Sequence, residues 1–203
     1  YSTHGTTMLP FYIFYSCFGF QRIGDLVWAA GDSRARGFLI GATAGRTTLS
    51  GEGLQHEDGS SHLLFSTVPN CVAYDPTYGY EVVTIIQDGM RRMLEEQDDV
   101  FYYVTVMNEN YPHPAMPENV SEGIIKGMYR IKEGAESKGA HAQLLGSGTI
   151  LREVLAASEL LQDDWKVSTD VWSVTSFTEL RRDGLSIDRE NMYNPEVAEK
   201  NTW

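Results

Sequence analysis

Cysteine is scarce in this sequence: among 203 residues only Cys17 and Cys71 occur, 54 positions apart. Neither belongs to a CxxC pair or to a Cys/His finger spacing, which argues against a disulfide framework and against a structural zinc site. Long hydrophobic runs are missing as well, since no apolar stretch reaches about 18 residues and no basic segment precedes an apolar one at the N-terminus. We therefore expect neither a membrane span nor a signal peptide, and we expect the reducing cytoplasm as the location.

Positive charge is also in short supply. Lysine and arginine total 16 against 28 aspartates and glutamates, which gives a net charge of −12 and a pI near 4.8. Such a chain has no electrostatic footprint for nucleic acid or for an anionic membrane, so its charge bears mainly on solubility. The length suffices for one large domain or two small ones. Because the chain begins without Met and ends at Asn-Thr-Trp, we expect a piece of a longer protein.

The first half of the chain alternates between helical and strand-like patterns. Aromatic and aliphatic side chains at three- and four-residue steps predict a helix over residues 11–30, which a Gly-Asp pair ends. A short apolar run at 38–40, bounded by glycines, predicts a buried strand. The sequence VPNCVAYDP predicts another short strand, which Asp75-Pro76 stops.

The pattern continues with a second helix, a third strand and a proline-broken loop. Residues 80–99 place valine, isoleucine and methionine on one helical face, and VFYYVTV at 100–106 is rich in β-branched and aromatic residues. Strands that alternate with helices predict an α/β fold with a mostly parallel sheet. Residues 142–177 repeat the pattern as strand, glycine turn, helix and strand, which is one βαβ unit of a second α/β domain.

The stretch GEGLQHEDGSSH, residues 51–62, crowds two histidines and three acidic residues among three glycines. One hypothesis is a metal site formed by His56, His62 and a carboxylate, although the helical HExxH spacing is absent and the glycines disfavour a helix. A solvated loop is the plain alternative. Glycine-rich loops after strands lie at the carboxyl edge of an α/β sheet, where such a loop can present an imidazole for proton transfer.

Three other patterns invite a functional interpretation. GATAGRTT at 41–48 resembles a phosphate-binding loop, but its glycines are one residue too close and Arg46 replaces the lysine. GSGTIL at 146–151 lies where a dinucleotide turn would lie, yet Leu151 occupies the place of the third glycine, so a tight βα turn is the plain alternative. The aromatic row from Phe11 to Phe20 is either core or a platform for a flat cofactor.

Several long segments of the sequence resemble one enzyme family. These segments are FGFQRIGD, GRTTLSGEGLQHEDG, the NENY and PAMPE stretch, LLGSGTILREV and DVWSVTSFTELRRDG. They closely resemble the homodimeric-type pyruvate dehydrogenase E1 component. The similarity covers nearly the whole chain and thins between residues 127 and 141 and after about residue 185. EDGSSH is also similar to the EDGPTH-type motif of transketolases, which indicates the wider thiamine-dependent superfamily.

The resemblance implies a fold and a domain layout. Residues 1–118 are expected to form the carboxyl-terminal part of a pyrimidine-binding domain with a mostly parallel sheet. Residues 119–141, rich in charge, are expected to be a linker. Residues 142–203 are expected to begin a second α/β domain of the transketolase C-terminal type.

The resemblance also implies an activity. Family members use thiamine diphosphate and Mg²⁺ to decarboxylate pyruvate, and they transfer the acetyl unit to a lipoyl group of the E2 partner, which feeds acetyl-CoA formation. Their active site forms between the two subunits of a homodimer. The implied partners are therefore pyruvate, the lipoyl domain of E2 and a second subunit, in the cytoplasm.

Site residues follow from the same resemblance. Phe18 is expected to pack on the aminopyrimidine of the cofactor, and Tyr15, one helical turn earlier, to reach the active centre. His56 is a candidate proton donor to the developing alkoxide or to lipoyl sulfur, and Glu52 is expected to orient that network. Further residues in matching motifs receive no role beyond support: Arg22, Glu57, Asp58 and His62.

Parts of the family's site have no match in this chain. The activating glutamate and the GDG motif for diphosphate and Mg²⁺ are expected outside it, so the chain alone is expected to be inactive. Two alternatives stay open: a non-catalytic, thiamine-domain-like assembly module, and another 2-oxo acid enzyme of the transketolase superfamily. A metal-dependent hydrolase is a more distant third.

Overall fold

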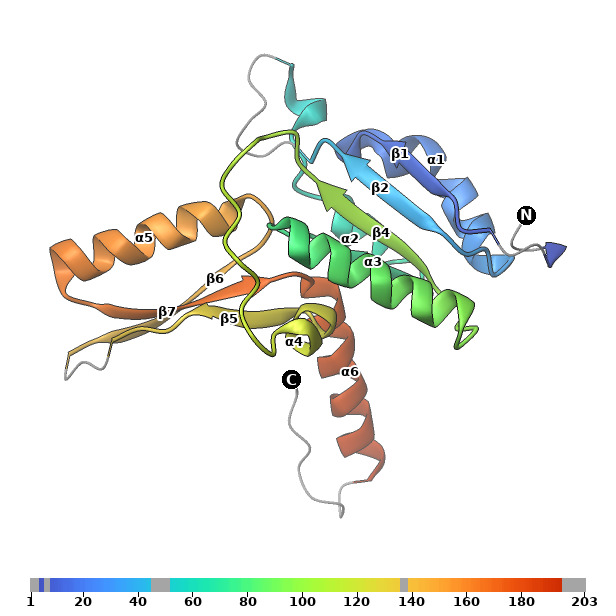
Figure 1. The fold of residues 1–203 in the computed structure, drawn as a ribbon. Coiled ribbons are helices and arrows are strands. Elements are labelled where there is room, and N and C mark those ends of the chain that lie inside the picture. Colours follow the sequence, from blue (N-terminus) through green and yellow to red (C-terminus); the bar gives the residue numbers. More distant parts are fainter. Residues whose placement is uncertain (1–3, 6–7, 45–51, 136–138, 195–203) are drawn as a thin grey trace.

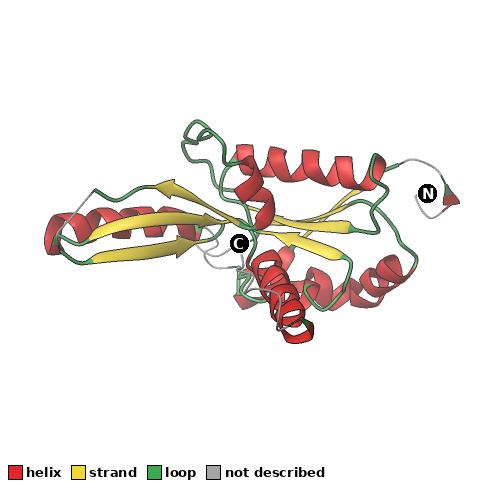
Figure 2. Cartoon of the chain, turned by 90° about the horizontal axis from the view of Figure 1, so that it is seen from below, coloured by secondary structure: helices red, strands yellow, loops and turns green. Residues whose placement is uncertain are grey.

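A computed structural model describes residues 4–5, 8–44, 52–135 and 139–194. The described chain forms two separate β-sheets that lie next to each other, with helices packed on them (Figures 1 and 2). Within these ranges, no helix is long and apolar enough to cross a membrane.

The first sheet is entirely parallel and has the strand order β1-β2-β4-β3. Its strands are β1 (Phe11–Phe14), β2 (Phe38–Ala42), β3 (Cys71–Tyr74) and β4 (Phe101–Val106). The helical segments around it are α1 (Ser16–Asp32), the 3₁₀ turn η2 (Leu54–His56), α2 (Ser61–Phe65) and α3 (Gly79–Leu94). The predicted α/β fold with a mostly parallel sheet is thus confirmed for the first half of the chain.

Alternation along β4 divides the core between the two faces of this sheet. Tyr102 packs with Ile85 and Met93 of α3, whereas Tyr103 packs with Val27 of α1 and Phe65 of α2. Both tyrosines are fully buried, as expected for strand packing. Figure 2 shows helices on both faces of the four-stranded sheet.

The predicted start of the first helix is wrong, because the sequence FYIF at 11–14 forms strand β1 and α1 begins only at Ser16. Spacing at three and four residues fits a helix, yet aromatic and β-branched side chains also favour strands. Pairing decides the outcome: Phe11 lies opposite Phe38 of β2, and their rings stack with centroids 4.7 Å apart. The predicted elements that correspond to β2, β3, α3 and β4 are confirmed.

The second sheet is three-stranded and mixed, with the order β5-β7-β6. The predicted βαβ unit is confirmed, since β6 (His141–Gly146) and β7 (Ser168–Val174) are parallel and α5 (Ile150–Trp165) connects them. Strand β5 (Met128–Lys132) pairs antiparallel with β7, and α4 (Ser121–Lys126) precedes it. Residues 119–141, predicted to be a linker, therefore carry one helix and an edge strand of the second sheet. Helix α6 (Phe177–Tyr193) follows β7.

A buried carboxylate joins the two sheets. Glu81, in the first turn of α3, is completely buried, and its Oε2 accepts hydrogen bonds from the backbone N–H groups of Thr77 and Tyr78 at 2.5 and 2.9 Å. Its Oε1 accepts from the Tyr129 hydroxyl of β5 and from the Ser173 hydroxyl of β7, both at 2.7 Å. Two donors from the loop between β3 and α3 and two from the second sheet thus compensate the cost of burying this group.

A second carboxylate is half-buried and has much poorer compensation. Glu179, in the first turn of α6, pairs with Arg182 at 3.3 Å, but its Oε1 atom has no hydrogen-bond partner. Burial raises the pKa of Glu179, and the positive charges of Arg182 and Arg92 only partly oppose that rise. Protonation of this side chain is therefore more favourable in the folded state than in the unfolded chain.

We expect the substitution Glu81→Gln to lower the free energy of unfolding by about 2–4 kcal/mol, because the amide NH₂ would face donors instead of accepting from them. Chemical denaturation measures the effect. The matched control is Glu122→Gln at the surface, where the side chain is 69% exposed and pairs with Lys126. Equal stability of the two variants would contradict the account of Glu81.

We expect Glu179 to make stability depend on pH in a direction opposite to that of most carboxylates. Because its pKa is raised in the folded state, its stabilising contribution is complete below its ordinary value of 4.5 and is lost as pH rises through the folded pKa. Glu179→Gln should therefore be more stable relative to the parent at pH 7 than at pH 4. Denaturation at both pH values measures this, and an unchanged difference would refute it.

Candidate active site

The candidate site lies where β1 and β2 end. In a parallel sheet these carboxyl ends share one edge, and α1 begins there directly after β1. The Ser16 hydroxyl donates to the carbonyl oxygen of Thr43 at 3.1 Å, which ties the start of α1 to the chain that follows β2. Position 41 must be glycine, because a Cβ atom there would lie only 2.4 Å from the Tyr103 hydroxyl oxygen. The first turn of α1 is thus held close to the sheet.

Three rings meet at this edge, and we call Tyr15, Phe18 and His56 the ring cluster. Tyr15 and Phe18 are three residues apart at the start of α1, with ring centroids 5.2 Å apart. The imidazole of His56, at the end of η2, lies edge-on to both rings, 4.9 Å from Tyr15 and 5.3 Å from Phe18. Tyr15 is 48% exposed, while Phe18 and His56 are half-buried. Three of the four predicted site residues are therefore neighbours.

Arg22 extends this group along α1. Its guanidinium carbon lies 4.2 Å from the centroid of the Phe18 ring, a cation–π contact one helical turn away. Glu52 differs from these residues. Its side chain is exposed, and its described contact is a backbone one, in which the Glu52 carbonyl accepts from the Gln55 amide at 3.2 Å. No described contact brings the Glu52 carboxylate into the ring cluster.

Asp58 anchors the loop that carries His56. It is only 3% exposed, and its Oδ1 accepts from the backbone N–H groups of Ser60 and Ser61 at 3.2 and 3.0 Å. Its Oδ2 accepts from the Ser61 hydroxyl at 2.5 Å, and the Tyr103 hydroxyl in turn donates to Ser61 at 2.9 Å. The neighbouring Glu57 is exposed. Asp58 therefore links the loop to α2 and to strand β4, two residues after His56.

The charge of Asp58 also affects a thiol beside the ring cluster. Partial burial raises the pKa of Cys17, and the negative charge of Asp58 raises it further. A raised pKa keeps Cys17 protonated near neutral pH, and a thiol is a poor nucleophile compared with a thiolate. This cysteine is therefore not an activated nucleophile.

His62 has different neighbours from those of His56. Its Nε2 lies 2.9 Å from the Thr105 hydroxyl oxygen and 3.9 Å from Oδ1 of Asp75, at the ends of β4 and β3. Among the residues that the structure describes, no group of three or more histidines, cysteines or carboxylates is placed to hold a metal ion. The hypothesis that His56, His62 and a carboxylate share one metal therefore finds no support in the described geometry.

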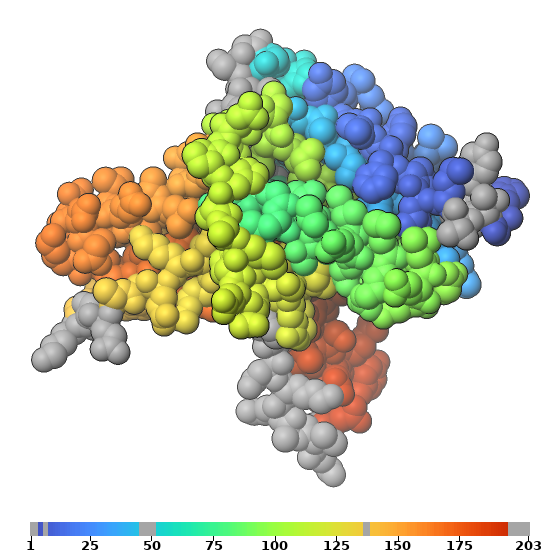
Figure 3. Space-filling view, viewed as in Figure 1, coloured from blue at the N-terminus to red at the C-terminus, as the bar shows by residue number. Residues whose placement is uncertain are grey.

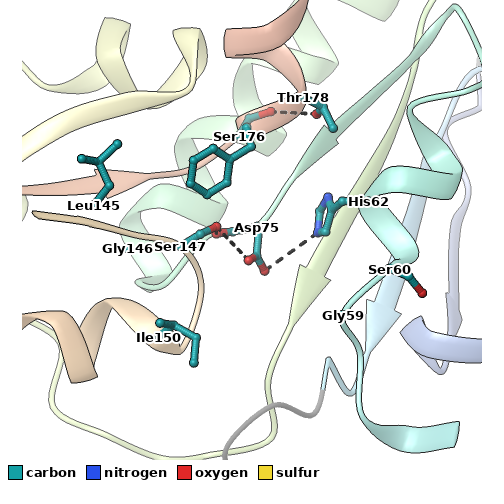
Figure 4. A pocket seen from close by; sticks show the side chains of 11 residues that line it. Gly59, Ser60, His62, Asp75, Leu145, Gly146, Ser147, Ile150, Ser176 and Thr178 are labelled. Atoms are coloured by element: carbon teal, nitrogen blue, oxygen red, sulfur yellow. Dashed lines mark hydrogen bonds and ion pairs between the residues drawn. The ribbon is translucent and has the colours of Figure 1, made fainter.

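A pocket of about 350 Å³ opens beside His62, at the seam between the two sheets (Figure 4). Polar groups meet in this pocket. The hydroxyl of Ser147, in the turn after β6, donates to Oδ2 of Asp75 at 2.8 Å. Sequence reasoning missed this arrangement and treated Asp75 only as the stop of a strand. The signal available in the sequence was that Asp75 follows a predicted parallel strand directly, at the sheet edge where ligands bind. The lining residues are Gly59, Ser60, His62, Asp75, Leu145, Gly146, Ser147, Ile150, Ser176, Phe177 and Thr178.

The two glycine-rich patterns have different outcomes. In GSGTIL the structure shows the tight βα turn, since a Cβ atom on Gly146 would lie 2.7 Å from the Cα atom of Leu151. In GATAGRTT the residues from 45 onward lie outside the described ranges. In the proline-broken loop, His113 is exposed, and its Nδ1 accepts from the Gly79 N–H at 3.0 Å.

Solved structures with a similar backbone define the fold class of this chain. Transketolase from Campylobacter jejuni superposes with a TM-score of 0.67 at 20% identity, over 86% of this chain and 26% of that one. Transketolase from Leishmania mexicana gives a TM-score of 0.64 at 14% identity, over 85% and 24% of the two chains. At these identities the comparison establishes the fold alone: the chain has a transketolase-like α/β fold.

Sequence comparison defines the family within that class. The family described as pyruvate dehydrogenase E1 component middle domain matches residues 1–114, and the transketolase-like TK C-terminal domain matches residues 127–202. The chain belongs to the pyruvate dehydrogenase E1 component family, which confirms the resemblance seen in its motifs.

Curated relatives agree with this assignment. Proteins named pyruvate dehydrogenase E1 component are 66% identical over 203 residues in Pseudomonas aeruginosa and 61% identical over 196 residues in Escherichia coli K12. The matched regions cover 100% and 96% of this chain but only 23% and 22% of those relatives. The chain thus spans less than a quarter of their length.

We expect Asp58→Asn to destabilise the loop, because an amide NH₂ would replace one of the two oxygens that accept hydrogen bonds from Ser60 and Ser61. The loss should be about 1–3 kcal/mol in the free energy of unfolding, with faster proteolysis of the loop. The matched control is Glu57→Gln, an exposed carboxylate at the adjacent position. If both variants resist denaturant and protease equally, Asp58 is not the anchor.

Proposed function

We propose that this chain is part of the E1 component of pyruvate dehydrogenase. The proposed activity is the oxidative decarboxylation of pyruvate and the reductive acetylation of the lipoyl group of E2, with thiamine diphosphate as cofactor. Family membership and identities of up to 66% to curated E1 components support this proposal. The observation that carries it is the contact of the His56 imidazole with both Tyr15 and Phe18 at the sheet edge.

The ring cluster suits the aminopyrimidine end of the cofactor. Phe18 is a half-buried aromatic ring at the rim of the sheet, and aromatic rings stack on flat heterocycles. Bound thiamine diphosphate supplies an electron sink for the charge left by decarboxylation. In the proposal Phe18 packs on the aminopyrimidine and Tyr15 lies beside the reacting centre.

His56 has the geometry of a proton donor in this proposal. Its ring is fixed edge-on between two aromatic rings, which restricts its orientation, and Asp58 anchors the loop two residues later. An oriented imidazole can donate a proton to a substrate oxygen that becomes negative, or to a lipoyl sulfur. Glu52 is proposed to orient this network, but the described contacts do not support that role.

The described residues do not fit the diphosphate end of the cofactor. Arg22 is a described cation next to the ring cluster, and the described ranges contain no group of three or more carboxylates, histidines or cysteines that could hold Mg²⁺. We therefore propose that the Mg²⁺ and diphosphate ligands, and the activating glutamate, belong to parts of the protein beyond this chain. Residues 1–118 and 142–203 are proposed as parts of two domains, joined through 119–141.

The proposal includes the partners of the complete enzyme. These are pyruvate, the lipoyl domain of E2 and a second subunit in a homodimer, in the cytoplasm. A non-catalytic assembly module is the weaker alternative. Such a module has no need of an imidazole seated against two rings beside an anchored loop, whereas an enzyme does.

We expect His56→Ala in the full-length protein to lower the rate of lipoyl-E2 acetylation by about 10²-fold or more, because general acid catalysis contributes effects of this size. Pyruvate-dependent reductive acetylation of lipoyl-E2 measures the rate, and thiamine diphosphate binding should be less affected. The control is His141→Ala, on β6 of the second sheet.

Equal rates for His56→Ala and the parent would refute the role of His56. A full-length parent that does not decarboxylate pyruvate with thiamine diphosphate present would refute the proposed function as a whole, and would favour the assembly module.

A further inference from the structure

A series of hydrogen bonds crosses from the second sheet to the loop of the ring cluster. In Figure 4, Ser147 and His62 approach Asp75 from opposite sides. Ser147 Oγ donates to Oδ2 of Asp75 at 2.8 Å, Thr105 Oγ1 donates to Oδ1 at 2.5 Å, and His62 Nε2 lies 2.9 Å from Thr105 Oγ1. We call Ser147, Asp75, Thr105 and His62 the polar relay.

The proton positions in the polar relay follow from its donors. The Thr105 hydroxyl has one hydrogen, and the shorter contact, to Asp75, takes it in preference to the Tyr74 carbonyl at 3.3 Å. The Thr105 oxygen is then an acceptor for His62, whose Nε2 must carry a proton. Each member of the polar relay therefore contacts the next one through a hydrogen bond.

Burial makes the polar relay stiff. Thr105 is fully buried and Asp75 is 6% exposed, so water competes poorly for these hydrogen bonds. The backbone adds two contacts at the same seam: Asp75 N–H donates to the Thr175 carbonyl at 2.7 Å, and Gly148 N–H donates to the Asp75 carbonyl at 3.0 Å. The segments that follow β6 and β7 thus help to hold Asp75 in place.

The polar relay ends on the helix that holds the His56 loop. His62 and Ser61 are both in α2, a helix of five residues. Ser61 donates to the buried Asp58 and also contacts Tyr103. Because α2 is so short, a displacement of His62 moves Ser61 and Asp58 with it, and Asp58 is two residues from His56.

We propose that Ser147, in the turn after β6, is a positioning residue for His56, acting through Asp75, Thr105, His62 and helix α2. The inference rests on the proposed function for the catalytic role of His56. It assigns GSGTIL a role in coupling the two sheets, in place of the nucleotide binding that its pattern suggests.

The pocket beside the polar relay shapes the experiment. A water molecule entering this space could replace the Ser147 hydroxyl in a serine-to-alanine variant and hide the effect. Valine and threonine fill the same volume and differ in the hydroxyl group alone. Ser147→Val and Ser147→Thr are therefore the matched pair, because both exclude water but only threonine can donate to Asp75.

Two measurements on the full-length protein test the proposal. The first is the rate at which diethyl pyrocarbonate modifies His56 at a fixed pH, followed by peptide mass spectrometry. The second is the steady-state kinetics of pyruvate-dependent acetylation of lipoyl-E2. We expect Ser147→Val to change the His56 modification rate about twofold or more and to lower kcat about 3- to 30-fold, with little change in KM, whereas Ser147→Thr resembles the parent.

The outcomes separate the possible failures. Identical His56 modification and identical kcat in the valine and threonine variants would overturn the coupling. If Ser147→Val does not fold, the pair Thr105→Val and Thr105→Ser replaces it. The valine variant interrupts the polar relay and the serine variant keeps its hydroxyl group, so the same two measurements test the coupling. A parent without pyruvate activity would remove the proposed function, while the modification rates would still report whether Ser147 positions His56.

Discussion

Buried carboxylates at the seam between the two sheets are the constraint on which this structure depends. An unpaired charge in a protein interior is so costly that donors must surround it, and here the donors come from both sheets. Glu81 collects hydroxyl groups from β5 and β7, and Asp75 collects them from β4 and from the turn after β6. Because hydrogen bonds are directional, these contacts restrict the relative position of the two sheets more than apolar packing alone would.

The candidate site uses the edge that this constraint holds in place. The ring cluster lies at the carboxyl ends of β1 and β2, and Asp58 and α2 connect its loop to Tyr103 and Thr105 on β4. The site residues themselves are half-buried or exposed, whereas Asp58, Tyr103 and Thr105, which hold the loop and α2, are buried. Such a division suits an enzyme, since reacting groups need access and their supports need rigidity.

Much of the fold could be predicted from local patterns. β-branched and aromatic residues marked β4, apolar spacing marked α3, and the glycine turn at 146–148 marked the parallel βαβ unit. The wrong prediction at FYIF shows the limit of this reasoning. These four aromatic and β-branched residues fit a helical spacing and also favour a strand, and only their pairing with β2 selected the strand. Strand β5 was missed within a charged segment, since an edge strand needs few apolar residues and gains its hydrogen bonds from β7.

The sequence by itself determined the alternation of strands and helices, the excess of negative charge and, through its motifs, the family, and it predicted Tyr15, Phe18 and His56 as site residues. Only the tertiary structure decided that these three rings touch, that Glu52 is not among the described contacts of the ring cluster, and that His62 belongs to a different network with Asp75 and Ser147. The physical reason is that spacing along a chain specifies local backbone and one face of an element. Contacts between residues far apart in the chain, such as Asp75 with Ser147 and Glu81 with Ser173, depend on how separate elements pack and on where buried charges find donors.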